Sequence, residues 1–402
     1  MKILFKKCSS VAFGVAALAL NLSAAAPAQV GSFFTNSPMS TARMEQLAIL
    51  LRNGKVLVAG GQGADYGHLA SAELFDPANG TWTPTGSMKH ARVNPAATLL
   101  PLDGKVFVVG GYDNLKTNGM VLPPGHPNLA GLYLPVRAEL YDPATGQWVE
   151  TDELNTIRRP ESATLLPNGK VLVTGDDGTG DGTTIAEIYD PASGTWTQTS
   201  SMTGGFTPTT TPLLFNGHVM IFGEFPHDNP HNAEIYNPDD GTWSAITNAA
   251  RLFTTPGHTM TLLSNGKVLF VAKPQSGYAV FTASCIEHND FSGVQLYDLA
   301  GGTSADGAPM AEPRSDHTAT LLLDGRVLVL GGQGRVPGGD PLRAELYDPT
   351  SDRWTQIPGH LATRRRDYTA TLLPNGKVLI AGGMPGLSST ELYDPGETSP
   401  LH

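Results

Sequence analysis

The sequence predicts an all-β protein in which seven four-stranded antiparallel blades form a ring, a seven-bladed β-propeller. Three observations predict it. A turn-plus-strand signature of the type Asn-Gly-Lys-Val-Leu-Val occurs seven times, a third-strand signature of the type Ala-Glu-Leu-Tyr-Asp-Pro follows each copy, and all five tryptophans follow such third strands. An isolated blade cannot bury both of its faces, so closing seven blades into a ring covers the faces and removes the long exposed edges.

The last complete repeat, residues 367–395, shows the unit most clearly. We expect a first strand at 369–373, a second at 378–381 and a third that ends at the Tyr-Asp-Pro of residues 393–395. Asn-Gly and Asp-Gly tolerate positive φ angles and favour two-residue hairpin turns between the first and second strands. The seven turn glycines are Gly54, Gly104, Gly169, Gly217, Gly266, Gly325 and Gly376.

The fourth strand explains how the ring closes. Five repeats carry its tryptophan, the fifth has Ser304 in that place, and the seventh repeat reaches the end of the chain first. Residues 32–43 resemble 81–92, and Phe33 precedes the next turn glycine by 21 residues, as the tryptophans do by 21 to 23. We therefore expect the N-terminal strand to complete the last blade, with Phe33 in place of tryptophan.

The first 28 residues have the pattern of a secretory signal peptide. Lysines precede an apolar run at 11–22, and small residues lead to a cleavage site after Ala28. A membrane anchor is the alternative, but a bilayer-spanning helix needs about 20 apolar residues. We expect a secreted or periplasmic protein whose residues 29–402 form a single propeller domain, monomeric and without membrane insertion.

Charge and cysteine content narrow the choice of partners. Removal of the signal's three lysines lowers the formal net charge from −11 to −14. A chain this acidic is repelled by nucleic-acid phosphates and anionic lipids, so we expect no nucleic-acid partner. Cys285 alone survives cleavage, which leaves no intramolecular disulfide. We expect no cofactor.

The spacing of about 50 residues, together with the Gly-Gly, Tyr and Trp pattern, resembles kelch repeats over residues 32–395. The chain also resembles the central propeller of galactose-oxidase-like proteins. That second resemblance implies a copper site with a Tyr-His pair at the start of a propeller strand, a tyrosine linked to a cysteine, and a histidine from a later domain. Here the matching positions read Asp316-His317 and Asp367-Tyr368, and Cys285 lies in a loop insertion. Copper-radical chemistry is therefore disfavoured.

Variable loops point to one face of the ring. The first–second and third–fourth turns are short and repetitive, so we interpret their face as structural. The second–third and fourth–first loops lie on the other face, and binding residues gather on loops of rigid scaffolds. Two of these loops carry insertions, at 112–136 and 274–293.

Residues that recur in most blades are expected to hold the blades together. The third-strand glutamates fit this interpretation: Glu73, Glu139, Glu187, Glu234, Glu345 and Glu391. Arginines at the start of the blades recur too, and they resemble the kelch Pro-Arg position. Structure is the first interpretation for them, with ligand binding at the channel mouth as the alternative, for which Arg158, Arg314 and Arg365 are the candidates.

Residues that occur in one blade need another reason. The second glycine of Gly-Gly is replaced in three consecutive blades by Asp176, Glu224 and Lys273. We expect these side chains to form a ligand-binding patch together with His231, although drift of relaxed repeats would also explain them. Calcium at Asp177–Asp181 and a transition metal at His227–His231 are weaker alternatives, so no metal site is predicted.

These features favour a binding module for a carbohydrate or an envelope protein at the channel mouth. The first alternative is an enzyme that cleaves sugars with carboxylates of blades 3–5, and the second is a protein-interaction scaffold without a small ligand. A deep carboxylate pair would favour the enzyme, a shallow aromatic-lined mouth would favour sugar binding, and a flat face of mixed charge would favour a protein partner.

Overall fold

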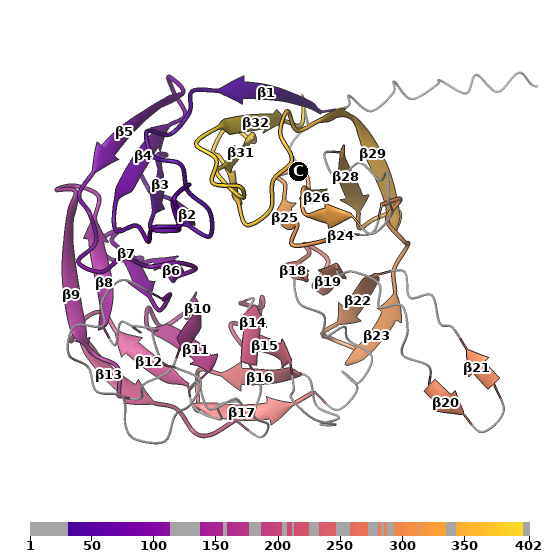
Figure 1. Cartoon of the computed structure of the whole chain (residues 1–402). Helices are drawn as coiled ribbons and strands as arrows, with labels where there is room; N and C mark the ends of the chain where they lie inside the picture. Colours follow the sequence, from indigo (N-terminus) through magenta and orange to yellow (C-terminus); the bar gives the residue numbers. More distant parts are fainter. Residues whose placement is uncertain are drawn as a thin grey trace, which may run out of the picture.

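The computed structural model describes residues 31–112, 137–155, 159–176, 186–202, 207–210, 213–224, 233–246, 258–271, 280–282, 285–287, 293–312, 314–334 and 343–396. The described residues form strands and turns arranged as seven four-stranded antiparallel sheets in a ring (Figure 1), which confirms the predicted seven-bladed β-propeller. The proposed signal peptide lies outside the described residues.

Each blade contributes its strands in order from the axis outward. Blade 1 contains β2 (Leu47–Leu50), β3 (Val56–Ala59), β4 (Ala72–Asp76) and β5 (Thr81–Thr85). Blade 2 contains β6 (Ala96–Leu99), β7 (Val106–Val109), β8 (Arg137–Asp142) and β9 (Gln147–Glu153). Blade 3 contains β10 (Arg159–Leu165), β11 (Val171–Asp176), β12 (Glu187–Asp190) and β13 (Thr195–Gln198). Blade 4 contains β14 (Thr207–Thr210), β15 (Val219–Glu224), β16 (Ala233–Asn237) and β17 (Thr242–Ala245).

The remaining blades follow the same plan. Blade 5 contains β18 (Thr259–Leu262), β19 (Lys267–Val271), β22 (Val294–Asp298) and β23 (Thr303–Asp306). Blade 6 contains β25 (Thr318–Leu321), β26 (Val327–Leu330), β28 (Arg343–Asp348) and β29 (Arg353–His360). Blade 7 contains β30 (Thr369–Leu372), β31 (Val378–Ala381), β32 (Thr390–Asp394) and β1 (Ser32–Asn36). Two small ladders lie outside the blades: β20 (Val280–Thr282) with β21 (Cys285–Glu287), and β24 (Arg314–Ser315) with β27 (Gln333–Gly334).

The N-terminal strand closes the ring as predicted. Strand β1 pairs with β32, and Phe33 lies opposite Tyr393, just as Trp82 lies opposite Phe75 in blade 1. The ring centroids of Phe33 and Tyr393 are 5.1 Å apart, close to the 5.0 Å between Phe75 and Trp82. Phe33 therefore makes the contact that tryptophan makes in the other blades.

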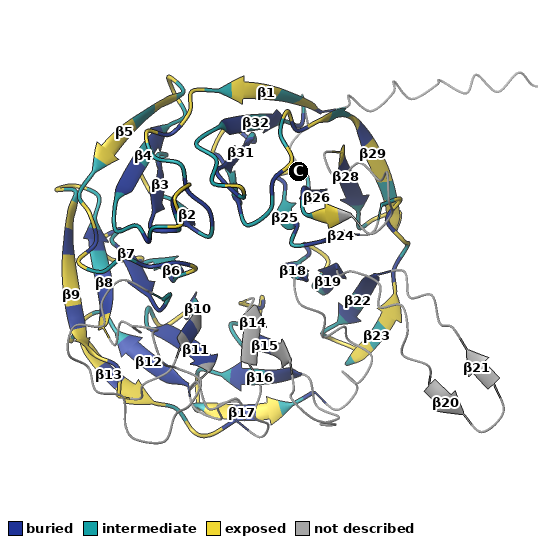
Figure 2. Cartoon of the chain, in the orientation of Figure 1, coloured by how far each residue is buried: buried dark blue, intermediate teal, exposed yellow. Residues whose placement is uncertain are grey.

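The hydrophobic core lies between blades rather than within them. Each of the seven clusters of buried apolar residues found in the described chain contains side chains from two neighbouring blades. The last joins Val58 of blade 1 to Leu379 of blade 7 across the closure. In Figure 2 the second and third strands are mostly buried, and exposed residues gather on the outermost strands. Closing the ring is thus what buries both faces of every blade.

The first–second turn is longer than predicted. Strand pairing ends at Leu50 and Val56, and Leu51 N–H then donates to the carbonyl of Lys55, which leaves a three-residue loop. Gly54 alone takes positive φ in this loop, at 81°, while the Asn53 side chain accepts a hydrogen bond from Lys55 N–H. This is the geometry of a type I turn followed by a left-handed glycine. The two-residue prediction was wrong because Asn53 acts through its side chain.

Candidate functional site

The blade-start arginines of blades 1, 2, 6 and 7 are buried. Arg43, Arg92, Arg314 and Arg365 are each exposed by 3% or less. Arg314 donates to the carbonyl of Arg343 at 2.8 Å and to Glu345 at 3.0 Å, and Arg365 donates to Glu391 at 2.7 Å. Burial lowers the pKa of Arg365, although Glu391 opposes that shift. Both guanidinium groups donate hydrogen bonds to carbonyl or carboxylate groups of their own blades. No ligand contact is shown for Arg314 or Arg365, so ligand binding through them stays a prediction.

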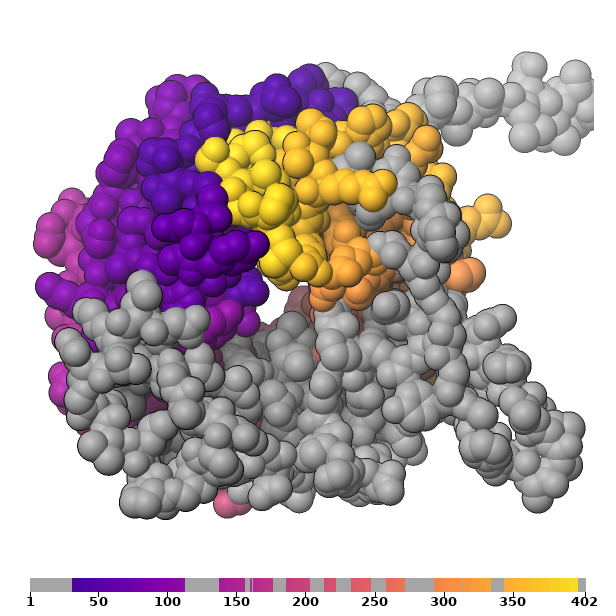
Figure 3. Space-filling model, viewed as in Figure 1, coloured from indigo at the N-terminus to yellow at the C-terminus, as the bar shows by residue number. Residues whose placement is uncertain are grey.

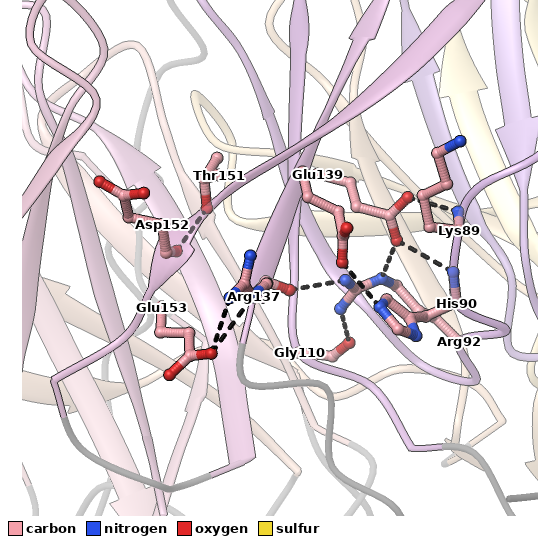
Figure 4. Close-up of polar contacts among 10 residues, drawn as sticks. Lys89, His90, Arg92, Gly110, Arg137, Glu139, Thr151, Asp152 and Glu153 are labelled. Atoms are coloured by element: carbon pink, nitrogen blue, oxygen red, sulfur yellow. Dashed lines mark hydrogen bonds and ion pairs between the residues drawn. The ribbon is translucent and has the colours of Figure 1, made fainter.

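The third-strand glutamates fix the chain where it enters a blade. In blade 2, Glu139 accepts hydrogen bonds from Arg92 Nε at 3.0 Å and from the backbone N–H of Lys89 at 2.6 Å (Figure 4). Arg92 also donates to the carbonyl of Gly110 at 2.8 Å. The same arrangement recurs at Glu73, Glu345 and Glu391. Each carboxylate thus joins its strand to the connection from the preceding blade, as the structural interpretation predicts.

The predicted patch of blades 3–5 is described only in part. Asp176 and Glu224 end the second strands β11 and β15, and their backbones pair with Arg159 and Thr207. Nothing is described of these two side chains, and Arg158, Lys273 and His231 lie outside the described residues, as do the 177–181 and 227–231 loops. The patch stays a prediction.

Other blades show what the second glycine of Gly-Gly does. Gly61 N–H donates to the carbonyl of Arg92 in the next blade at 2.7 Å, and Gly332 and Gly383 make the matching contacts. A Cβ on Gly61 would lie 2.5 Å from the carbonyl oxygen of Met44, and its φ is +87°. The glycine therefore permits tight contact between blades.

Three carboxylates that we had not singled out as ligand candidates line one part of the loop face. Glu45, Asp316 and Asp367 each stand two residues after the blade-start arginine and two residues before the first residue of an inner strand. We call them the acidic rim. All three have positive φ, between 52° and 55°. Backbone hydrogen bonds join the rim across blades 7, 1 and 2, since Glu45 N–H donates to the carbonyl of Asp367 at 2.9 Å and Asn94 N–H to that of Glu45 at 2.8 Å.

The acidic rim is electrostatically coupled. Burial raises the pKa of Asp367, the charges of Glu45 and Asp316 raise it further, and Arg366 opposes them. Tyr112 of blade 2 donates its hydroxyl to Glu45 at 2.8 Å, and its ring packs edge-on against His68 with centroids 5.5 Å apart. Burial and the neighbouring Glu45 raise the pKa of Tyr112. The rim is therefore a set of carboxylates in partly desolvated surroundings.

Arginines stand next to these carboxylates on blade 7. Arg364 is exposed, and Arg366 Nε lies 3.6 Å from Asp367 Oδ2. Figure 3 shows an opening near the centre of the ring, bordered by the indigo and purple blades on one side and the yellow and orange blades on the other. Blades 6, 7, 1 and 2 thus present mixed charge on the loop side.

The residue after each rim position holds neighbouring blades together. Gln46 Nε2 donates to the carbonyl of Ala381 at 2.8 Å, Tyr368 bonds Thr318 at 2.9 Å, and His317 Nε2 bonds Thr259 at 2.8 Å. Each side chain belongs to one blade and its partner to the preceding blade. In blade 2 the position of Gln46, His317 and Tyr368 is occupied by Pro95. The preceding blade has Leu47, which carries no hydroxyl, where blades 5, 6 and 7 have a threonine. Burial lowers the pKa of His317 to about 3.

Neither a cluster of metal ligands nor a membrane-spanning helix occurs among the described residues. Within the described ranges, no three His, Cys, Asp or Glu side chains approach closely enough to hold a metal ion together. The same part of the chain contains no helix with the length and apolarity needed to cross a bilayer.

The acidic rim carries a signal that could have been found in the sequence. The pattern Arg-x-Glu or Arg-x-Asp recurs at Arg43, Arg314 and Arg365. The arginine is the more prominent signal because it recurs in more blades. The carboxylate two residues later takes no part in the buried pair between the blade-start arginine and the third-strand glutamate, and it forms the rim.

Comparison with known proteins agrees with this architecture. A family model described as "Kelch motif" matches residues 48–89. The kelch repeat-containing protein kel-10 of Caenorhabditis elegans is 36% identical over 136 residues, which cover 31% of this chain and 23% of that protein. An F-box/kelch-repeat protein of Arabidopsis thaliana is 42% identical over 62 residues, covering 15% and 16%. The matches span less than a quarter of these relatives.

A solved structure matches far more of the chain. A fungal alcohol oxidase of the AA5 family, described in complex with copper, aligns over 93% of this chain and 79% of its own, with a TM-score of 0.66 and 17% identity. At that identity the likeness concerns the fold alone. The positions compared with the copper site are occupied differently here, since His317 bonds Thr259 and Tyr368 bonds Thr318. These residues do not fit a copper centre of that kind.

Proposed function

Because the chain is a kelch-repeat β-propeller, we propose that it is a protein-binding module whose partner meets the loop side of blades 6, 7, 1 and 2. One observation carries this proposal: the acidic rim of Glu45, Asp316 and Asp367 stands beside Arg364 and Arg366. Surfaces of mixed charge select and orient partner proteins through complementary charges.

The rim is also preorganised for binding. Hydrogen bonds between blades fix the backbone of Glu45 and Asp367, and Tyr112 holds the Glu45 carboxylate. A surface that is already ordered loses little conformational entropy when a partner binds. The carboxylates of the rim are partly exposed to solvent, but because they are already held in place they can contribute to the affinity for a partner protein.

The partner would be an exported or envelope protein if residues 1–28 direct export. This location is part of the proposal and rests on the signal-peptide pattern of the sequence. Carbohydrate binding is the second candidate function. It is favoured by an open pocket beside Arg366 that is lined by arginine, amide and apolar side chains.

Photo-crosslinking in cells tests the protein-binding function. A photoreactive residue would replace Asn94, which is exposed next to the rim, and in a matched variant Leu102, which is 81% exposed at a first–second turn. We expect a discrete covalent adduct from position 94 that weakens when Asp367→Lys is added. Adducts from position 102 alone would move the site to the turn face, and the absence of adducts from both positions would contradict the proposal.

A further inference from the structure

An open pocket of about 360 Å³ lies where blades 6 and 7 meet on the loop side. Blade 6 contributes Gln333, and blade 7 contributes Arg364, Arg366, Met384 and Pro385. The pocket lies beside the acidic rim. Arg366, which forms an isolated β-bridge with Met384, is the residue directly before Asp367 of the rim. It therefore combines cationic, amide and apolar groups within a small volume.

The repeats show that the two arginines are not needed to build a blade. Blade 3 has Ile157 before its blade-start arginine Arg158 and Arg159 after it, but blades 1, 2 and 6 place small or apolar residues on both sides of theirs. Their pairs are Ala42 and Met44 in blade 1, Ala91 and Val93 in blade 2, and Pro313 and Ser315 in blade 6. Blade 7 alone has arginine at both positions. Since the neighbouring blades fold without them, Arg364 and Arg366 require a reason other than packing.

Among the described residues, the Arg366 guanidinium makes its shortest contacts with a thioether sulfur and only a long ion pair with a carboxylate. Its Nε and Nη2 lie 3.0 and 2.7 Å from the sulfur of Met384, and Asp367 is 3.6 Å away. A thioether is a weak acceptor, whereas a guanidinium offers five donors in a planar fork that suits a carboxylate. Arg364 is exposed on the same pocket, so within the described part of the chain two arginines there have donors not used by strong acceptors.

Gln333 adds a hydrogen-bond acceptor to the donors of the two arginines. Its Nε2 donates to Asp316 at 3.1 Å, so the amide oxygen is the group left to accept a hydrogen bond. Met384 and Pro385 give an apolar wall. Donors, an acceptor and an apolar surface suit a ligand that has a carboxylate, hydroxyl groups and a C–H face.

We propose that this pocket binds a sugar acid, a uronate, with its carboxylate on Arg364 and Arg366 and a hydroxyl on Gln333. The proposal deepens the second candidate function and does not depend on the protein partner. An acidic peptide can also satisfy the arginines, and its backbone N–H can donate to the Gln333 oxygen. A uronate carries its carboxylate, hydroxyl groups and C–H face on one small ring, which favours it for a pocket where the arginines, Gln333 and the Met384–Pro385 wall lie together.

Calorimetric titration of the purified chain at low salt tests the proposal. The probes are galacturonate and glucuronate, with galactose and glucose as neutral counterparts and triglutamate as the peptide carboxylate. The variants are Arg364→Gln, Arg366→Gln and Gln333→Ala. Arg353→Gln serves as the matched control, because Arg353 is an exposed arginine on the outer strand of blade 6.

We expect a uronate to bind at least about tenfold more tightly than the neutral sugars, because charge-assisted hydrogen bonds carry the difference. Each pocket arginine variant should weaken that binding about tenfold, and Arg353→Gln should leave it unchanged. Thermal melting would verify that every variant is folded. Equal binding of acidic and neutral sugars, the absence of uronate binding, or stronger binding of triglutamate would each overturn the proposal.

Discussion

Two arcs of the ring obey the repeat to different degrees. Blades 6, 7, 1 and 2 keep both Gly-Gly and the blade-start arginine, and we call them the strict arc. Blades 3, 4 and 5 replace the second glycine by Asp176, Glu224 and Lys273, and form the relaxed arc. The second strands show the difference directly. They end at Ala59, Val109, Leu330 and Ala381 before Gly-Gly in the strict arc, but continue through Asp176 and Glu224 in blades 3 and 4.

The cause is the backbone conformation of the second glycine. Gly61, Gly332 and Gly383 have φ between 86° and 107°, which residues with a side chain rarely adopt. An aspartate or glutamate there favours extended backbone, so the strand runs on. In the strict arc the second glycine therefore serves contact between blades. The residues near it, which include the acidic rim, Arg364 and Arg366, differ from blade to blade.

The largest expected effect comes from breaking a buried ion pair of the strict arc. Arg314→Ala would leave Glu345 buried without its cation, which typically costs about 3–5 kcal/mol. Urea unfolding would measure the loss. Replacing both residues by methionine should recover only part of it, because the uncompensated charge is then gone but the backbone N–H groups of Ala311 and Glu312 lose their acceptor. A single substitution without effect would contradict the structural role of the arginines.

The next largest effect is expected when the residue at the second Gly-Gly position is exchanged between the two arcs. Gly61→Asp should destabilise the fold by roughly 3 kcal/mol, because the side chain meets the Met44 carbonyl and the φ is unfavourable. Asp176→Gly should change the free energy of unfolding by less than about 1 kcal/mol. Comparable losses from both substitutions would mean that the arcs do not differ in the way we describe.

A pH effect of a few kcal/mol is expected where the arcs meet, at the contact of His317 in blade 6 with Thr259 in blade 5. Burial depresses the pKa of His317 to about 3, whereas an unfolded chain protonates histidine below about 6.5. The unfolded state therefore binds the proton first, and stability falls as the pH drops from about 6.5 towards 3. The difference in unfolding free energy between the wild type and His317→Gln should shrink over that range. A difference independent of pH would contradict this.

The smallest effect concerns the contact between blades made by Gln46. Gln46→Ala removes its hydrogen bond to the Ala381 carbonyl and should cost about 1 kcal/mol. Pro95→Ala at the matching position of blade 2 removes no such bond and serves as the control. Thermal melting of both variants would resolve the difference.

Most of the fold could be predicted from the sequence, because the pattern recurs and each repeat supports the assignment of the others. The closure by Phe33, the seven blades and the structural glutamates follow from residues that recur at fixed spacing. Turn length did not follow, because Asn53 uses its side chain rather than positive φ. Repetition gives the identity of a position but not its backbone angles.

The candidate site was harder to predict for a related reason. Arg314 and Arg365 looked suitable for binding because they are cationic and stand near the mouth. Their burial depends on the glutamate that the next strands bring beside them. The acidic rim is assembled from three separate blades, and its coupling depends on distances around the ring, which no stretch of sequence contains.

The central claim is that the loop side of the strict arc is the protein-binding surface. The most direct test is the dissociation constant of the crosslinked partner for two charge variants measured side by side, Asp367→Lys on the acidic rim and Leu102→Lys on the turn face. We predict at least about a tenfold loss for the first and no change for the second. Equal affinities, or a loss confined to Leu102→Lys, would contradict the claim.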